Sequence, residues 1–364
     1  MKLTEQGVCI LKTLWRLAVC GGLAALVFFA VQELPSLLPD RERIASLIVS
    51  AAVTPLPERP IEAQAEPLDL ACIPAEPELP IADAFYDELF RKQQEKEALF
   101  SVPDGAQLIR SVDLSSPPGN VINQTDYDPP SADTLPVSAA PHALTAGGDP
   151  VLLVIHTHGT ESFSDNGTYY TADTATRSSD PTQNMVAVGD AFCDRLTALG
   201  VPLLHCRTPF DEESYNDSYT LSGKAVADTL EQYPSIRYVL DLHRDSILFS
   251  DGTKARPLSD SGRAQIMFVV GSDRGGALHP NWRDNYALAL RLTSYLYERD
   301  PTICRAVNLR TASFNQQLSS GFLLVEMGAC GNTLEEVKAS ALLLAEAFAA
   351  HLGIEVPFSP ATDK

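Results

Sequence analysis

VLLVIHTH, at residues 151–158, is the first of four apolar runs that decide the fold of this chain. Each run is nearly continuous in apolar residues and ends in polar or ionisable ones. Strands that are buried on both faces of a sheet have this pattern, because helices cover both sides of such a sheet. The other three runs are YVLDLH (238–243), QIMFVVGSD (265–273) and FLLVEMG (322–328).

The segments between and after these runs have the apolar spacing of helices, with Pro or Gly near several of their ends. Thr333 and Glu336 have the spacing of a capping box at the start of the last one. We therefore predict an α/β fold, a single three-layer domain over residues 150–356 with a mixed, mostly parallel sheet flanked by helices. The predicted helices span residues 184–199, 222–233, 281–299 and 333–352.

Charge and cysteine content exclude several classes of protein. The formal net charge of −20 argues against nucleic acid as a partner, because phosphate contacts need a surplus of Lys and Arg. The 7 cysteines contain no CxxC pair and have no regular spacing. Neither a disulfide framework nor a cysteine zinc knuckle is therefore indicated.

The N-terminal part of the chain has the pattern of a membrane anchor. Lys2, Lys12 and Arg16 precede an apolar run at 17–34, which is roughly long enough to cross a bilayer once its flanks are counted. The positive-inside rule then leaves residues 1–16 in the cytoplasm and exports the rest. A cleaved signal peptide is the alternative, because the run is short and contains small residues. Both interpretations place the α/β domain outside the membrane.

Residues 35–149 have the composition of a Pro-rich extracytoplasmic linker. Pro, Glu and Ala dominate its first part, and such a composition buries too little apolar surface to offset the entropy of the chain. Within it, residues 81–99 have helical periodicity and predict one short helix. Residues 357–364 form a tail.

Histidines and carboxylates follow three of the four predicted strands. His156, His158 and Glu161 come at the end of the first run, and Glu326 lies in the last one. His243, Arg244 and Asp245 follow the second run. Ligands gather at the carboxyl ends of strands in open α/β sheets, where side chains leave the core. We therefore expect these groups to meet at one rim of the sheet.

Two imidazoles and one carboxylate suit a catalytic Zn²⁺, which takes nitrogen and oxygen ligands and keeps a fourth position open for water. The metal lowers the pKa of that water to roughly 7. A further carboxylate is then needed to move the proton to the leaving amine. The residues at the predicted rim are sufficient for such a site.

Each residue also has a plainer interpretation. A single histidine at a strand end is commonly a hydrogen-bonded structural residue. His156 and His158 would share a face only in a regular strand, and a turn that begins at Thr157 would separate them. We therefore expect only one of the two to bind metal. Glu161 could simply occupy a turn, and Arg244 with Asp245 could form an ion pair that braces the loop. Glu326 favours a functional role, because a carboxylate inside an apolar strand is costly to bury without a partner.

An ordered set of motifs runs through the second half of the chain. It consists of HTHGTES (156–162), DLHRDS (241–246), VVGSD (269–273), NW (281–282), FNQQLSSG (314–321) and LLVEMGACGNTLEE (323–336). Together these motifs resemble the stage II sporulation protein P family of endospore-forming bacteria. The resemblance covers about residues 150–355, and the ordered set is specific although no single hexapeptide would be. Upstream, the similarity is architectural only, an anchor followed by a spacer.

The family looks like a relative of the zinc N-acetylmuramoyl-L-alanine amidases, and the resemblance implies a site. It implies that His158 and His243 bind zinc and that Glu326 is the catalytic glutamate. The third ligand of the amidases is a glutamate at the start of the following helix, but the predicted helix here begins with Asn184 and Met185. Glu161 is the expected substitute.

The supporting roles follow from these assignments. Arg244 or Asn315 is expected to steady the substrate or the oxyanion. Asp245 is expected to contact and orient His243 without binding the metal itself. His156 is expected to lie next to the metal ligands.

The resemblance also implies a biological setting. Members of the family are described as peptidoglycan hydrolases that combine amidase with endopeptidase cleavage. They act during engulfment of the forespore, with stage II sporulation proteins D and M as partners. The expected location is the mother-cell membrane, with the catalytic domain facing the intermembrane space. The sequence leaves the balance of the two activities open.

Two rival functions belong to other classes. The same groove could hold peptidoglycan for a partner enzyme without catalysis, in which case the protein need not bind zinc. A serine hydrolase is disfavoured, because the chain has no GxSxG motif.

Overall fold

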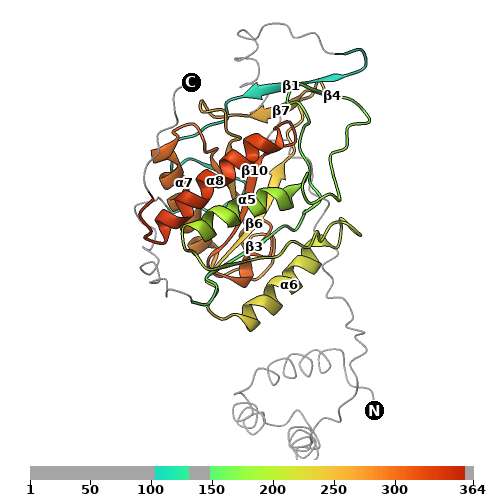
Figure 1. Cartoon of the computed structure of the whole chain (residues 1–364). Coiled ribbons are helices and arrows are strands. Elements are labelled where there is room, and N and C mark those ends of the chain that lie inside the picture. Colours follow the sequence, from blue (N-terminus) through green and yellow to red (C-terminus); the bar gives the residue numbers. More distant parts are fainter. Residues whose placement is uncertain (1–102, 131–147, 357–364) are drawn as a thin grey trace, which may run out of the picture. The chain divides into compact units, whose positions relative to one another are not determined.

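The computed structural model describes residues 103–130 and 148–356 (Figure 1). The predicted membrane anchor at 17–34, the predicted helix at 81–99 and the tail at 357–364 lie outside these residues. Within the described ranges, no helix combines the length and the apolar character needed to cross a membrane.

A seven-stranded main sheet forms the centre of the described part of the chain. All neighbouring strands run parallel except β8 and β10, which are antiparallel. The prediction of a mixed, mostly parallel sheet is therefore confirmed. In spatial order the strands are β2 (Val121–Asn123), β9 (Val307–Leu309), β8 (Ile266–Val270), β10 (Phe322–Ala329), β6 (Tyr238–Asp245), β3 (Leu152–Ile155) and β5 (Leu203–His205).

Alternate residues of the central strands enter different hydrophobic clusters, which explains the continuous apolar runs in the sequence. Leu152 and Val154 of β3 pack in the large cluster that contains residues of α5, α7 and α8. Leu153 and Ile155 pack on the opposite face with Val226 of α6. Helices therefore cover both faces of the sheet (Figure 1). Their bounds are α5 Met185–Ala198, α6 Ser218–Gln232, α7 Trp282–Arg299 and α8 Leu334–His351.

The helix ends follow local side-chain chemistry. The Asn184 side chain accepts a hydrogen bond from the backbone N–H of Val186 at the start of α5. Thr333 and Glu336 form the predicted capping box at the start of α8. The helix predicted from 222 begins earlier, at Ser218, whose hydroxyl donates to the Tyr215 carbonyl oxygen.

A second, three-stranded sheet corrects the predicted domain boundary at residue 150. Its central strand β1 (Gln107–Val112) runs parallel to β7 (Lys254–Pro257) and antiparallel to β4 (Tyr169–Tyr170). Both β1 and β2 lie within residues 35–149, which we predicted to be a linker. The average composition of that range conceals the short strand sequence QLIRSV, of which Ile109 and Val112 are buried. The folded part therefore begins upstream of residue 150.

Phe348→Ala is expected to lower the free energy of unfolding by about 3–5 kcal/mol, because it removes a large, fully buried side chain. The ring of Phe348 lies 6.4 Å from that of Phe192 and 5.2 Å from that of Tyr238, centroid to centroid. Leu342→Ala on the same helix is the control, since Leu342 is 44% exposed and its loss should cost about 0.5 kcal/mol or less. Urea denaturation measures both, and equal losses would contradict this packing.

Candidate metal centre

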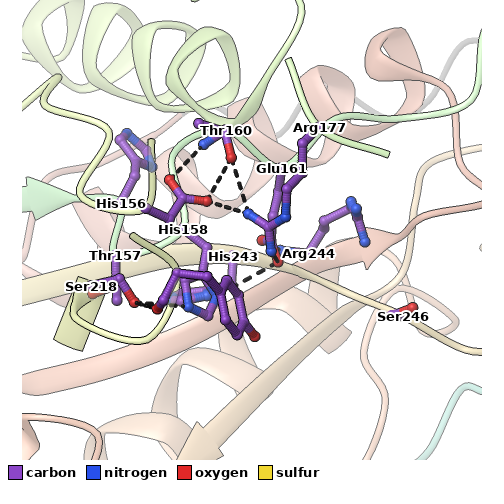
Figure 2. A network of polar contacts seen from close by, with 12 residues as sticks. His156, Thr157, His158, Thr160, Glu161, Arg177, Ser218, His243, Arg244 and Ser246 are labelled. Carbon is purple, nitrogen blue, oxygen red and sulfur yellow. Dashed lines mark hydrogen bonds and ion pairs between the residues drawn. The ribbon is translucent and has the colours of Figure 1, made fainter. Parts of the chain in front are cut away.

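Three neighbouring strands of the main sheet bring the predicted site residues together. Strand β6 lies between β3 and β10 and runs parallel to both. His158 and Glu161 lie in the turn after β3, and His243 lies near the end of β6. Glu326 of β10 is in register with His243. Figure 2 shows His158, Glu161 and His243 converging from these elements.

His158, Glu161 and His243 form a buried cluster that could hold one metal ion. Each offers a ligand atom, and the three atoms lie within 4.8 Å of one another. Nδ1 of His158 lies 3.7 Å from Oε1 of Glu161, and the two imidazole centroids are 5.0 Å apart. Two nitrogen donors and one carboxylate oxygen are a donor set that suits Zn²⁺ with a further position open. The residues present therefore fit the ion that the sequence predicts.

The charges of the cluster are strongly coupled. Burial alone would lower the pKa of His243, but the carboxylates of Asp241 and Glu161 outweigh burial and raise it to about 10. Burial would raise the pKa of Glu161, but hydrogen bonding to His158 and the charge of Arg244 lower it to about 2. The metal-free site therefore holds a protonated His243 beside an ionised Glu161. Metal binding has to displace the proton from His243.

The backbone fixes the carboxylate of Glu161. Its backbone N–H donates to the His158 carbonyl oxygen at 3.2 Å, which closes the turn between the two ligands. Its Oε2 accepts a hydrogen bond from the backbone N–H of Arg244 at 3.0 Å. The second oxygen, Oε1, then faces His158. A turn residue three positions after a histidine can thus supply the third ligand.

Asp241 is a buried residue of the site that the sequence analysis missed. Its carboxylate is inaccessible to solvent and lies 3.0 Å from Nε2 of His243. It also accepts hydrogen bonds from the backbone N–H and the hydroxyl of Thr157, at 2.8 and 2.5 Å. Asp241 therefore links the strand that carries His243 to the turn that carries His158. Its position two residues before His243, on the same face of β6, was the available signal.

Asp245, which we expected to orient His243, lies elsewhere. Its Oδ2 is 2.7 Å from a guanidinium nitrogen of Arg305. The carboxylate that faces Nε2 of His243, at 3.0 Å, is that of Asp241. Asp241 therefore occupies the place that we predicted for Asp245.

Asp241→Asn is expected to weaken zinc binding by about 10–100-fold, because the loss of a carboxylate behind a ligating histidine typically has that effect. The amide keeps the shape of the side chain but removes the charge that faces His243. Competition with a chromophoric chelator measures the affinity, and Asp228→Asn on the exposed side of α6 is the control. An unchanged affinity in Asp241→Asn would contradict this role.

His156 lies apart from the cluster. A turn begins at Thr157, and the buried ring of His156 is directed to His205, with 2.8 Å between the two Nε2 atoms. Its Nδ1 lies 3.3 Å from the Leu242 carbonyl oxygen. Burial lowers its pKa to about 3, so the ring is neutral. A Cβ on Gly189 of α5 would lie 2.4 Å from its Nε2, which shows how closely α5 packs there.

Arg244 braces the loops around Glu161. Its guanidinium donates to the carbonyl oxygens of Ser162 at 2.6 Å, Thr176 at 2.7 Å and Asp245 at 3.3 Å. Arg244 therefore braces the loops through backbone carbonyl oxygens. The ion pair with Asp245 that the plainer interpretation assumed is wrong, because the Asp245 carboxylate pairs with Arg305.

Asn315 also has protein partners. Its amide donates to the Tyr219 carbonyl oxygen at 2.7 Å and to the Ser222 hydroxyl at 3.3 Å. Its left-handed backbone, with φ at 60°, starts a short 3-10 helix at Gln316–Leu318. These contacts tie that helix to α6, beside the site.

Two residues that the sequence analysis did not single out form the exposed wall of the centre. The ring of Tyr215 stacks on His158, with 4.5 Å between centroids, and is 47% exposed. The guanidinium of Arg177 lies 4.8 Å from the Tyr215 centroid, and one of its nitrogens is 3.9 Å from Oε1 of Glu161. Both residues lie in irregular segments. Such segments have no apolar periodicity, so the sequence does not predict where their side chains lie.

The fold and this site define a three-layer α/β protein with a buried His-Glu-His centre at the rim of its sheet. Residues 90–349 match the family model of stage II sporulation protein P, and the chain belongs to that family. The resemblance predicted from the motifs is therefore confirmed.

A curated relative shares this family. Stage II sporulation protein P of Bacillus subtilis (strain 168) is 28% identical over 219 residues, which are 57% of this chain. The match spans 52%, about half, of that relative's own length.

Among solved structures, several amidases align with low identity. The N-acetylmuramoyl-L-alanine amidase AmiC2 of Nostoc punctiforme is 16% identical, with a TM-score of 0.34, and the alignment covers 56% of this chain and 96% of that one. The CwlD amidase of Clostridioides difficile, solved in complex with the GerS lipoprotein, is 12% identical, with a TM-score of 0.37 and coverages of 57% and 100%.

Proposed function

We propose that this protein is a zinc-dependent hydrolase that cleaves amide bonds of peptidoglycan during forespore engulfment. The observation that carries the proposal is the convergence of His158, Glu161 and His243 in one buried cluster, with Glu326 in register beside it. Membership of the stage II sporulation protein P family supports the role in sporulation. The bond proposed is the one between muramic acid and the stem peptide, with cleavage of peptide cross-links as an additional activity.

The proposed roles divide between ligands and a proton carrier. His158, Glu161 and His243 would hold the ion. Zinc bound there supplies a Lewis acid that polarises the amide carbonyl and makes a water molecule acidic. Glu326 accepts the proton of the attacking water and returns it to the departing nitrogen. Glu326 is in register with His243 and is only partly buried.

The neighbouring residues keep this arrangement in place. Asp241 holds His243 and the turn at Thr157, and Arg244 holds the chain on both sides of the site. Tyr215 offers an exposed aromatic face next to His158 for a substrate ring or chain. The oxyanion would be steadied by a donor at this rim, and Arg177, which is partly exposed there, is the cation placed to do so.

The cellular setting is part of the same proposal. An anchor at 17–34 would hold the domain outside the mother-cell membrane, within reach of the peptidoglycan between the two membranes. Stage II sporulation proteins D and M are the proposed partners.

The digestion of purified peptidoglycan tests this function. The full chain in detergent should release stem peptides and leave glycan strands without peptides, as identified by mass spectrometry, and a chelator should stop the release. Cleaved cross-links among the fragments would assign the endopeptidase activity. If the wall remains intact with zinc present, the rival function, a scaffold that holds peptidoglycan for another enzyme, is favoured instead.

A further inference from the structure

A pocket lies next to the candidate metal centre, on the side of the three-stranded sheet. Its cavity volume is about 10 Å³, which is room for one water-sized group such as a carboxylate oxygen. Its wall includes Ser162 and Thr176, whose carbonyl oxygens accept the hydrogen bonds of Arg244. Ser162 directly follows Glu161, so one peptide bond joins the pocket to the cluster. Tyr170, Lys254 and Cys330 complete the side that faces β1.

Lys254 is a buried cation in the wall of this pocket. It is 9% exposed, and its Nζ lies 3.7 Å from the centroid of the Tyr170 ring. Among the residues that the structure describes, no carboxylate forms an ion pair with it, and no hydrogen bond holds its ammonium group. The aromatic ring is therefore its main compensation.

An aromatic ring compensates a buried ammonium only in part. A desolvated cation–π contact contributes less free energy than the effective penalty for burying an ion. Burial lowers the pKa of Lys254, the neighbouring Cys330 partly opposes this, and the charge of Arg244 lowers the pKa further. The described lining of the pocket contains no carboxylate. An anion bound there would therefore stabilise the ammonium group of Lys254.

We propose that this pocket is a carboxylate-binding subsite in which Lys254 holds a free carboxylate of the substrate's peptide. This rests on the proposed function and extends it, because it specifies a peptide with an unamidated carboxylate close to the bond that is cut. The stem peptide of peptidoglycan has such carboxylates within a few bonds of its amides. Because Ser162 of the pocket wall directly follows Glu161, the pocket and the cluster lie close enough in the fold for one peptide substrate to be considered at both.

The three-stranded sheet holds Lys254 in place. Lys254 is in register with Ile109 of β1, and Tyr170 of β4 is in register with Gln107 of the same strand. The Tyr170 hydroxyl lies within hydrogen-bonding distance of Gln107 Oε1 and of the Gly252 carbonyl oxygen, and these contacts hold the ring beside the ammonium group. The segment upstream of residue 150 therefore has a function in this account, because it forms one side of the subsite.

Calorimetry on the full chain after removal of metal tests the subsite without hydrolysis. The probes are N-acetyl-L-alanyl-γ-D-glutamyl-L-lysine amide with a free glutamyl α-carboxylate, and the same tripeptide with that group as a carboxamide. The wild type should bind the carboxylate form about 10-fold more tightly, by a charge-assisted interaction. Lys254→Met should remove the difference, and Lys224→Met, at an exposed lysine of α6, should keep it.

Several results would overturn the proposal. They are equal binding of both tripeptides to the wild type, an unchanged preference in Lys254→Met, and binding of inorganic phosphate in place of the tripeptide. Circular dichroism confirms that Lys254→Met is folded, and Lys254→Gln provides a polar second variant with the same expected loss. If the wild type digests the wall but shows no preference, only the subsite fails. If it shows the preference but does not digest the wall, only the hydrolase proposal fails.

Discussion

Glu326→Gln is expected to reduce peptidoglycan amide hydrolysis by about 10²–10⁴-fold, the usual contribution of a general acid–base. The amide of the variant has nearly the same shape as the carboxylate but cannot accept the proton of the attacking water. Glu326 is not one of the three clustered ligands, so zinc affinity should remain within a few-fold of the wild type. A large loss of rate with retained metal is therefore the expected signature.

The measurement is the rate of stem-peptide release from purified peptidoglycan at saturating zinc. Glu335→Gln is the matched control, because Glu335 lies on α8 with its side chain 84% exposed and should leave the rate unchanged. Retention of the wild-type rate in Glu326→Gln would remove Glu326 from the mechanism. Loss of zinc together with activity would instead make it a ligand.

His243→Ala is expected to weaken zinc binding by more than about 100-fold, because even an outer partner of a ligand contributes 10–100-fold. The substitution removes one of the two nitrogen donors and leaves His158 with Glu161. It also leaves the Asp241 carboxylate without the imidazole that it faces. Zinc-dependent hydrolysis should be lost at any zinc concentration that the wild type needs for full activity.

Chelator competition and metal analysis after dialysis measure this effect. His351→Ala is the control, because His351 lies on α8 beside Tyr238 and outside the cluster. Equal zinc content in His243→Ala and in the wild type would place the metal at other residues.

The sheet could be predicted from the sequence because its strands are long apolar runs that end in chemically distinctive residues. The four runs correspond to β3, β6, β8 and β10. The strands β2 and β9 could not be predicted in this way, because each has 3 residues and its pairing is set by distant neighbours. Strand β1 has 6 residues but lacks a continuous apolar run. Pairing of β1 with β7 is a tertiary interaction that local composition does not encode.

The residues of the candidate site that could be predicted from the sequence are those that lie at the ends of strands. The rim brings His158, Glu161 and His243 together, and the turn after Ile155 separates His156 from them. Whether they bind zinc remains a prediction. Supporting contacts were harder to foresee, because Asp241 looked like part of an apolar run.

The contacts between loops could not be predicted from the sequence, for a different reason. Tyr215 and Arg177 meet only because separate loops fold over the rim. No periodic pattern connects positions of that kind.

The central claim is that His158, Glu161 and His243 bind one zinc ion. X-ray absorption spectroscopy of the purified, zinc-loaded full chain, combined with a measurement of its metal content, tests this claim most directly. The account predicts one zinc per chain, with nitrogen and oxygen ligands at about 2.0–2.2 Å, an imidazole signal from two histidines and no sulfur. A sulfur shell near 2.3 Å, or a protein that binds no zinc, would contradict it.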